Sequence, residues 1–283
     1  MSKTSLKHQV YADDTTMYVP VNEDTIHGDS IKTDIHLIIE WFKRFGLSLN
    51  ASKTEICLFK SFKNKFDIKT FDICQETINL KDSIETLGTL IDRYVRLENQ
   101  VNQVCKSCYF QLRKLYSISH YLSRENKILL VRTLILLRLD YCNSLYIALN
   151  DKLIKKLQRV QNAACRFIYG LRKRSSITIY LHDLHWLPIL FRIKFKVLCY
   201  VHRVIYDPPS VPVYITSLFE LNKRTRCFNL NIPKVKTNFG KRSLKFTGAQ
   251  LWNSLPLELK MIEKHEIFRS KLKTYYFRSH YYK

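Results

Sequence analysis

The sequence predicts an α+β protein, with a small antiparallel sheet and one helix followed by a mainly helical region. Before residue 92, apolar and polar residues alternate in several short runs, which is the pattern of half-buried strands. From about residue 97 the apolar residues recur at three- and four-residue steps, as in amphipathic helices. The charge changes in the same region: residues 1–100 carry 13 Lys and Arg against 15 Asp and Glu, and the remainder carries 34 against 9. An excess this large and one-sided favours a polyanionic partner for the later part.

Two adjacent aspartates, Asp13 and Asp14, lie between short runs that mix apolar, polar and β-branched residues. We expect a β-hairpin with residues 12–14 at or near its tight turn, so that both carboxylates are exposed at the tip. Carboxylate oxygens placed in this way can bind a hard divalent cation such as Mg²⁺. Aspartates are also common turn residues, so the pair alone leaves a purely structural role open.

One helix and several further strands are expected next. Residues 22–46 carry apolar side chains at three- and four-residue steps, and Gly46 supplies a stop. We expect this helix to pack on the sheet that holds the two aspartates. A strand is expected at residues 56–59, and residues 66–92 alternate as short hairpin-like strands. Gly88 in the last of these allows close backbone approach.

Three helices are expected in the following part, over residues 101–115, 123–139 and 151–170. Ser123 is a moderate N-cap for the second, and Gly170 ends the third. Solvent-facing helices usually interleave both signs of charge, but no Asp or Glu occurs between Asp151 and Asp183. A phosphate-binding face and an ordinary solvated face are both open at this point. The basic residues concerned are Lys152, Lys155, Lys156, Arg159, Arg166, Arg172, Lys173 and Arg174.

The last hundred residues predict further helix and a basic stretch. Residues 175–206 are expected to be helical, with Ser175 or Ser176 as the cap, and the proline-rich run 207–212 breaks the chain. Residues 213–247 mix basic residues with phenylalanines. They either contact single-stranded nucleic acid by phosphate binding and stacking or form a loosely ordered arm. A small helical unit is expected at the end.

The cysteines and the lengths of the apolar runs bear on whether the protein is secreted, binds a metal or spans a membrane. Eight cysteines are scattered and no signal peptide precedes them, so we expect an intracellular protein, nuclear or cytoplasmic and not secreted. Cys105 and Cys108 form a lone C-x-x-C in a helical pattern, where core-facing thiols are favoured over metal ligands. For His182 and His185, three residues apart, structural packing is likewise favoured. No run reaches 18 apolar residues, so no membrane-spanning segment is expected.

Several stretches in a fixed order resemble one protein family. The residues are Tyr11–Asp14 (YADD), Gly46–Glu55, Glu85–Asp92, Arg138–Leu145, Leu157–Ala164, Leu184–Pro188 and Gly248–Pro256. Together they resemble the C-terminal part of the reverse transcriptase, an RNA-directed DNA polymerase, of non-LTR (LINE-type, jockey-like) retrotransposons. The resemblance covers nearly the whole chain. The four-residue acidic motif alone would not be specific.

The resemblance implies three domains and a set of roles. Residues 1–96 would be a partial polymerase palm with the YADD hairpin, 97–174 a helical thumb-like domain, and 175–283 a basic, mostly helical C-terminal region. An RNA template and a DNA primer would be the partners. Asp13 and Asp14 would be catalytic ligands of Mg²⁺, Lys53 a general acid or merely a solvated lysine, and the basic residues after Asp151 phosphate ligands. Leu87 and Gly88 would form the primer grip, although an edge hairpin is the ordinary alternative.

The chain departs from the family pattern in one respect. A polymerase palm needs a third carboxylate from an upstream strand, and the ten residues before Tyr11 contain no Asp or Glu. We therefore expect a truncated product, catalytically incomplete by itself, that retains template–primer binding. An active enzyme that receives the missing N-terminal polymerase part from elsewhere is one alternative. A non-catalytic basic nucleic-acid-binding protein, or a structural helical protein, is another.

Overall fold

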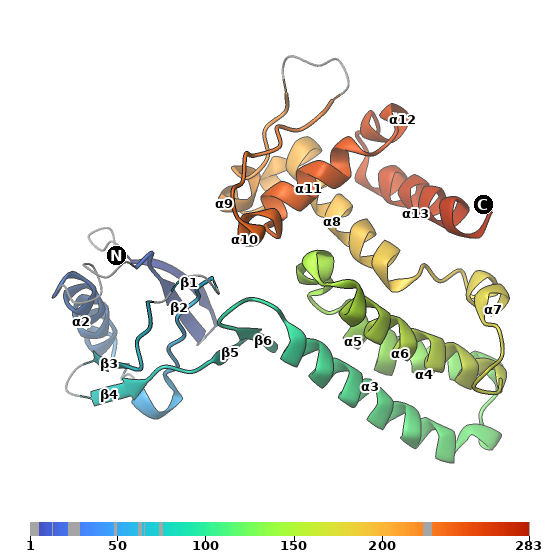
Figure 1. Cartoon of the computed structure of the whole chain (residues 1–283), viewed down its shortest axis with the longest axis horizontal. Helices are drawn as coiled ribbons and strands as arrows, with labels where there is room; N and C mark the ends of the chain where they lie inside the picture. Colours follow the sequence, from blue (N-terminus) through green and yellow to red (C-terminus); the bar gives the residue numbers. More distant parts are fainter. Residues whose placement is uncertain are drawn as a thin grey trace. The chain divides into compact units, whose positions relative to one another are not determined.

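The structure is a computed structural model that describes residues 6–12, 14–21, 29–47, 50–61, 64, 66–73, 76–222 and 228–282. The chain forms two compact units, residues 1–96 and 97–283, which are treated separately below (Figure 1). Strands lie in the first unit and most helices in the second, so the α+β class is confirmed. The segments 97–174 and 175–283 belong to the same unit, because α6 (Asp151–Tyr169) and α8 (Ile189–Tyr206) pack together within it.

The described strands of the N-terminal unit form three two-stranded antiparallel sheets. They pair β1 (Lys7–Tyr11) with β2 (Asp14–Tyr18), β3 (Thr70–Ile73) with β4 (Glu76–Asn79), and β5 (Ser83–Thr86) with β6 (Thr89–Asp92). The expected hairpin at the aspartates is present: Tyr11 pairs with Asp14, and Asp13 lies outside the described residues. A single small sheet was expected. Among the described strands, each instead pairs only with its neighbour in sequence.

The helix of this unit, α2 (Asp29–Arg44), lies within the expected 22–46, and residues 22–28 of that prediction lie outside the described residues. Ile31, Ile38 and Ile39 form its buried side, and Gly46 follows it with φ of 73°. α2 packs mainly against β3, not against the hairpin as expected. Residues 56–59 do not form the expected strand, because only Ile56 has a strand partner, in a single parallel bridge to Leu80. A 3₁₀ turn, η1 (Ala51–Lys53), precedes them.

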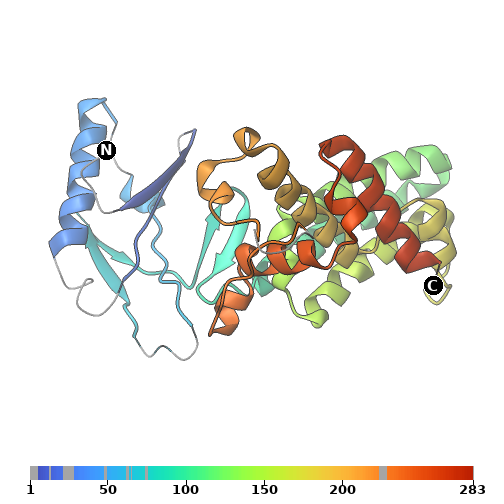
Figure 2. The same cartoon turned by 90° about the horizontal axis from the view of Figure 1, so that it is seen from above.

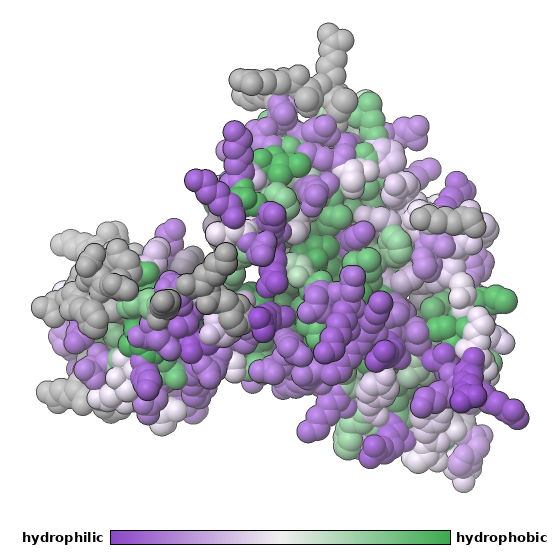
Figure 3. Space-filling view, in the orientation of Figure 1, coloured by the Kyte–Doolittle hydropathy of each residue, from purple (hydrophilic) through white to green (hydrophobic). Residues whose placement is uncertain are grey.

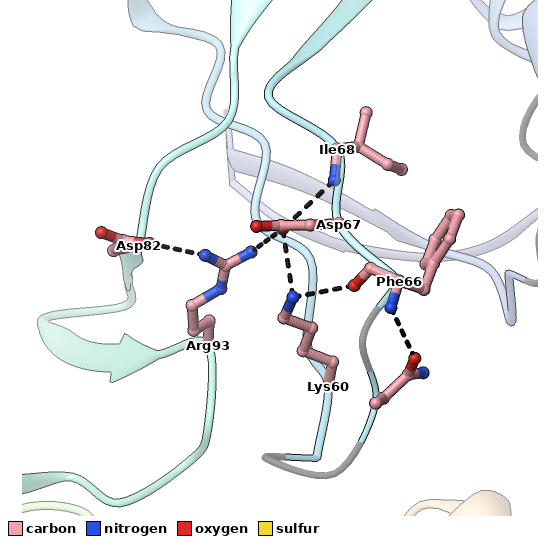
Figure 4. A network of polar contacts seen from close by, with 7 residues as sticks. Lys60, Phe66, Asp67, Ile68, Asp82 and Arg93 are labelled. Carbon is pink, nitrogen blue, oxygen red and sulfur yellow. Dashed lines mark hydrogen bonds and ion pairs between the residues drawn. The ribbon is translucent and has the colours of Figure 1, made fainter.

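A network of charges fixes the loop before β3 to the β5–β6 hairpin (Figure 4). The Arg93 guanidinium donates to Asp67 at 2.5 Å and to Asp82 at 3.0 Å. Lys60 donates to the Phe66 carbonyl at 2.8 Å and lies 3.2 Å from Asp67. The side chains of Arg93 and Lys60 are mostly buried, so these bonds satisfy cations that would otherwise be costly to remove from water. The hydrogen bond from Arg93 is the largest cause that holds the pKa of Asp67 below its usual value.

The C-terminal unit begins with α3 (Glu98–Ser117), α4 (Arg124–Val131), α5 (Leu137–Asp140) and α6 (Asp151–Tyr169). Ser123 caps α4 by accepting from the Asn126 amide at 3.2 Å, as expected. A π-helical turn, η3 (Arg132–Leu136), interrupts the expected helix 123–139 between α4 and α5. Asn150 caps α6 by accepting from the Leu153 amide at 2.9 Å, and Gly170 ends it in the left-handed conformation. Two further 3₁₀ turns, η2 (Ser119–Tyr121) and η4 (Asn143–Ala148), join these helices.

A second group of helices completes the unit. Its members are α7 (Thr178–Asp183), α8 (Ile189–Tyr206), α9 (Val213–Thr216), α10 (Asn238–Lys241), α11 (Leu244–Asn253), α12 (Leu257–Lys260) and α13 (His265–Tyr281), with a 3₁₀ turn, η5 (Pro208–Ser210), after α8. α8 runs beside both α11 and α13 (Figures 1 and 2). Trp252, Phe268, Leu198 and Leu272 meet between these three helices and are fully buried. Gly248 of α11 leaves room for the Phe219 ring, because a Cβ at this position would lie 2.8 Å from it.

Several local expectations can be compared with this packing. Ile177, and neither Ser175 nor Ser176, precedes α7, and the helical stretch expected from 175 to 206 is broken before Pro188. Trp186 is buried, and Cys105 and Cys108 are core-facing thiols on α3, as expected. Burial raises the pKa of the Cys108 thiol to about 12. No helix among the described residues has both the length and the apolar composition needed to cross a membrane.

Candidate nucleic-acid interface

A row of cations follows one side of α6. Lys152, Lys155 and Arg159 are exposed and separated by three and four residues, which places them on one helix face. The opposite face is buried through Leu157 and Ala164. Arg166 continues the row, so it spans about 21 Å of helix at 1.5 Å per residue. Hydrophilic side chains gather over this part of the unit (Figure 3). A row of this length can follow about six base-pair steps of a duplex at 3.4 Å each.

Two tyrosines of α3 lie beside this row. Tyr109 is close enough to Arg159 and Arg166 for their positive charges to act on its pKa, and Tyr116 is close enough to Arg166 for the same effect. Lys156 joins the two helices by donating to the side-chain oxygen of Asn102. We define the α3–α6 face as these tyrosines and the α6 cations: Tyr109, Tyr116, Lys152, Lys155, Lys156, Arg159 and Arg166. Both tyrosine rings are partly exposed, so this face offers cations and aromatic surface together.

The electrostatics of the face favour an external anion. Among the described residues, none of its five cations forms an ion pair with an acid. Burial raises the pKa of Tyr109 and of Tyr116, so both phenols stay neutral at physiological pH and add no negative charge. The Nε of Arg166 is buried without a hydrogen-bond partner among the described residues, and its Nη2 donates weakly to the Ser175 carbonyl at 3.4 Å.

The remaining basic residues of the prediction lie beyond the helix. Arg172, Lys173 and Arg174 are exposed in the turn that follows Gly170. The nearest acid in sequence, Asp183, is already bound by Arg124 at 2.5 Å and by the Tyr169 hydroxyl. The hydrogen bond from Tyr169 is the largest cause that lowers the pKa of Asp183. The three cations of the turn therefore have no acidic partner among the described residues.

Of the residues predicted for catalysis, Asp14 and Lys53 lie on separate elements of the N-terminal unit. Asp14 is the exposed first residue of β2, and Asp13 lies outside the described residues. Lys53 ends the short η1 turn, is exposed, and donates its backbone amide to Asn50. No hydrogen bond or ion pair of the described chain connects Asp14 with Lys53. Within the described residues, no group of three or more His, Cys, Asp or Glu could hold a metal ion, so magnesium binding stays a prediction.

The predicted primer-grip residues form the tight turn between β5 and β6. Thr86 pairs with Thr89, so Leu87 and Gly88 are the two turn residues, with φ of 47° and 71°. Positive φ at both positions is typical of a type I′ hairpin turn, which favours Asn-Gly. Leucine is strained in this conformation, and its side chain is 46% exposed. The turn therefore presents an apolar side chain at a cost in backbone energy.

Leu87→Asn should stabilise the N-terminal unit by about 1 kcal/mol, because asparagine tolerates the left-handed conformation that leucine resists. Amide exchange of the β5 and β6 backbone is the measurement, and slower exchange is the expected result. Leu87→Ala is the control, because alanine keeps the Cβ and the strain. Equal protection in the asparagine and alanine variants would contradict the proposed strain at this turn.

Comparison with known proteins gave no match: no protein-family model, no curated protein and no solved structure matches the chain.

The structure adds residues that the prediction did not contain. Lys106, Tyr109, Arg113 and Tyr116 are exposed and recur on α3 at steps of three and four residues. That spacing is visible in the sequence, but only the packing of α3 on α6 shows which of these residues face the α6 cations.

Proposed function

We propose that this chain is the C-terminal part of a reverse transcriptase of the non-LTR, LINE-type class, and that it binds a template–primer duplex through the α3–α6 face. In this proposal the duplex is formed by an RNA template and a DNA primer. Asp13 and Asp14 would contribute to a magnesium site whose further carboxylates come from other parts of the polymerase. By itself the described chain would bind the duplex without extending the primer.

The observation that supports this proposal most is the row of cations on α6. Lys152, Lys155 and Arg159 are exposed and have no acidic partner among the described residues. Together with Arg166 they follow about 21 Å of one helix face. A duplex backbone offers a matching row of phosphates, whereas a solvated protein surface needs no such segregation of charge. The YADD hairpin and the turn at Leu87 support the polymerase class through the resemblance of their sequences.

The salt dependence of duplex binding tests the proposal. If the four exposed cations Lys152, Lys155, Lys156 and Arg159 each neutralise one phosphate, the logarithm of affinity should fall with the logarithm of salt with a slope of about −3.6. Raising the salt threefold should then weaken binding of an RNA–DNA hybrid by about fiftyfold. Fluorescence anisotropy with the whole chain measures this. Absent binding, or a flat salt dependence, would instead favour a structural helical protein.

A non-catalytic nucleic-acid-binding protein is the second candidate. The tyrosines of α3 favour it in one respect, because aromatic rings beside cations also suit unpaired bases. The same titration discriminates the two candidates when a single strand of equal length is added. Tighter binding of the hybrid duplex supports the thumb-like role, and tighter binding of the single strand supports the alternative.

A further inference from the structure

A small pocket opens between α8 and α13, on elements that the proposed interface does not use. Its volume is about 170 Å³. Its walls are Phe195, Lys196, Cys199, Tyr200 and Arg203 from α8 and His265 and Arg269 from α13. The two helices run antiparallel, since His202 stacks near His265 at one end and Phe191 meets His280 at the other. The pocket is much smaller than the 300–1,000 Å³ typical of sites for drug-sized ligands, so it suits a single small group.

Positive charge dominates this pocket. Lys196 and Arg203 lie about two turns apart on the same face of α8, and Arg269 lines the pocket from α13. None of the three forms an ion pair with an acid among the described residues. Burial raises the pKa of the Cys199 thiol to about 11, so Cys199 remains neutral at physiological pH. The cations therefore line a hollow whose wall, in the described part of the chain, contains no acidic residue.

The histidine in the pocket wall, His265, is held in one orientation by a second histidine, His202. His202 is 1% exposed, and its Nε2 lies 2.6 Å from the Ile262 carbonyl, to which it must donate. Its Nδ1 is then an acceptor, so the His265 Nδ1, 3.2 Å away, is the donor between the two rings. The Nε2 of His265 is left to take up a proton. Because His265 is the first residue of α13, the positive end of the helix dipole also lies at the pocket.

We propose that this pocket binds a phosphate group, held by the guanidinium groups of Arg203 and Arg269. Arginine suits this ligand because its planar fork donates two parallel hydrogen bonds to phosphate oxygens. Lys196 adds a point charge, and a protonated His265 adds a further donor. The group is either a free phosphate or a backbone phosphate of a nucleic acid. These sources share the same chemistry and differ only in what else is attached. The site is independent of the α3–α6 face.

Isothermal titration of the whole chain with inorganic phosphate, in a chloride buffer, tests the proposal. The double variant Arg203→Gln, Arg269→Gln should weaken phosphate binding at least tenfold. The matched control is Lys271→Gln, Arg278→Gln, which removes the same charge from exposed positions of α13 and should change affinity less than twofold. Arg269→Lys keeps the charge but loses the fork, so an intermediate affinity is expected even if the double variant does not fold.

A pH series with sulfate adds a local test of His265. Sulfate keeps its charge between pH 6 and 8, so a change of affinity must come from the protein. Burial, Arg203 and Arg269 lower the pKa of His265, and Asp207 and Glu266 oppose them, so His265 is neutral at pH 7 without a ligand. An anion beside the ring favours its protonated form, and sulfate should bind more tightly at pH 6 than at pH 8. His265→Gln should remove this difference.

Three results would overturn the proposal: no saturable binding of phosphate or sulfate, an equal loss in the control variant, or full affinity in the Arg203→Gln, Arg269→Gln variant. Titration of the RNA–DNA hybrid then identifies the source. Weaker hybrid binding by the Arg203→Gln, Arg269→Gln variant assigns the pocket to a backbone phosphate, and unchanged hybrid binding assigns it to a free phosphate. Substitutions on α6 should leave phosphate affinity unchanged, so failure of this site and failure of the α3–α6 face give different results.

Discussion

Replacing Lys155 and Arg159 by glutamine should weaken binding of an RNA–DNA hybrid about thirtyfold at 150 mM salt. Each phosphate contact contributes roughly 0.9 to the slope of affinity against salt, which corresponds to about fivefold in affinity at this salt concentration. The two side chains are exposed and lie on the face of α6 that is opposite its core, so their loss removes contacts without disturbing packing. The salt slope should also become shallower by about 2.

Fluorescence anisotropy at several salt concentrations measures both quantities. The control is the variant Lys271→Gln, Arg278→Gln, which carries the same net charge and should retain most of the affinity. If both variants lose affinity equally, general charge attraction explains the binding and the α3–α6 face has no special role. Tyr109→Leu refines the result: it keeps an apolar side chain but removes the ring, and should weaken single-strand binding more than duplex binding.

Local signals in the sequence predict the helices that carry the proposed interface. The bounds of α6 agree with the prediction because Gly170 marks its end and the apolar spacing marks its buried face. The sequence also predicts that the α6 cations share one face, because residues three, four and seven positions apart lie on the same side of a helix. The π-helical turn η3 has no such signal, because it depends on how the two halves of that helix pack on neighbouring helices.

Features that join distant segments could not be predicted. The sequence indicates short strands, but it does not show that the described strands form three separate hairpins, because pairing between hairpins depends on their arrangement in space. Tyr109 and Arg159 are 50 residues apart in sequence and meet only through the packing of α3 on α6. The phosphate pocket joins α8 to α13 in the same way, with about 60 residues between Arg203 and His265. Residue spacing predicts which side chains share a face of one helix, but it does not show which two helices meet to form a site.

As the pH is lowered, the C-terminal unit should lose stability before most carboxylates become protonated. His202 should be the main cause of this loss. The ring is 1% exposed and stacks on Phe268 at 4.1 Å. Burial is the largest cause that lowers its pKa from 6.5 to about 4. Below pH 6.5 the unfolded chain binds a proton at this residue while the folded chain does not, so the free energy of unfolding falls as the pH falls from 6.5 to 4. The loss is up to about 3 kcal/mol in total, of which about 2 kcal/mol is expected by pH 4.5.

Urea unfolding between pH 7 and pH 4.5, followed by tryptophan fluorescence, measures this loss. A Trp41→Phe background leaves Trp186 and Trp252 as reporters, both in the C-terminal unit. His202→Gln should be less stable at pH 7, because it loses the stacking on Phe268, but its stability should change much less with pH. His120→Gln, at an exposed histidine, should behave as the unmodified chain does. If the His202→Gln variant loses as much stability as the unmodified chain over this range, other groups carry the pH dependence and the neutral state of His202 is not what acid disrupts.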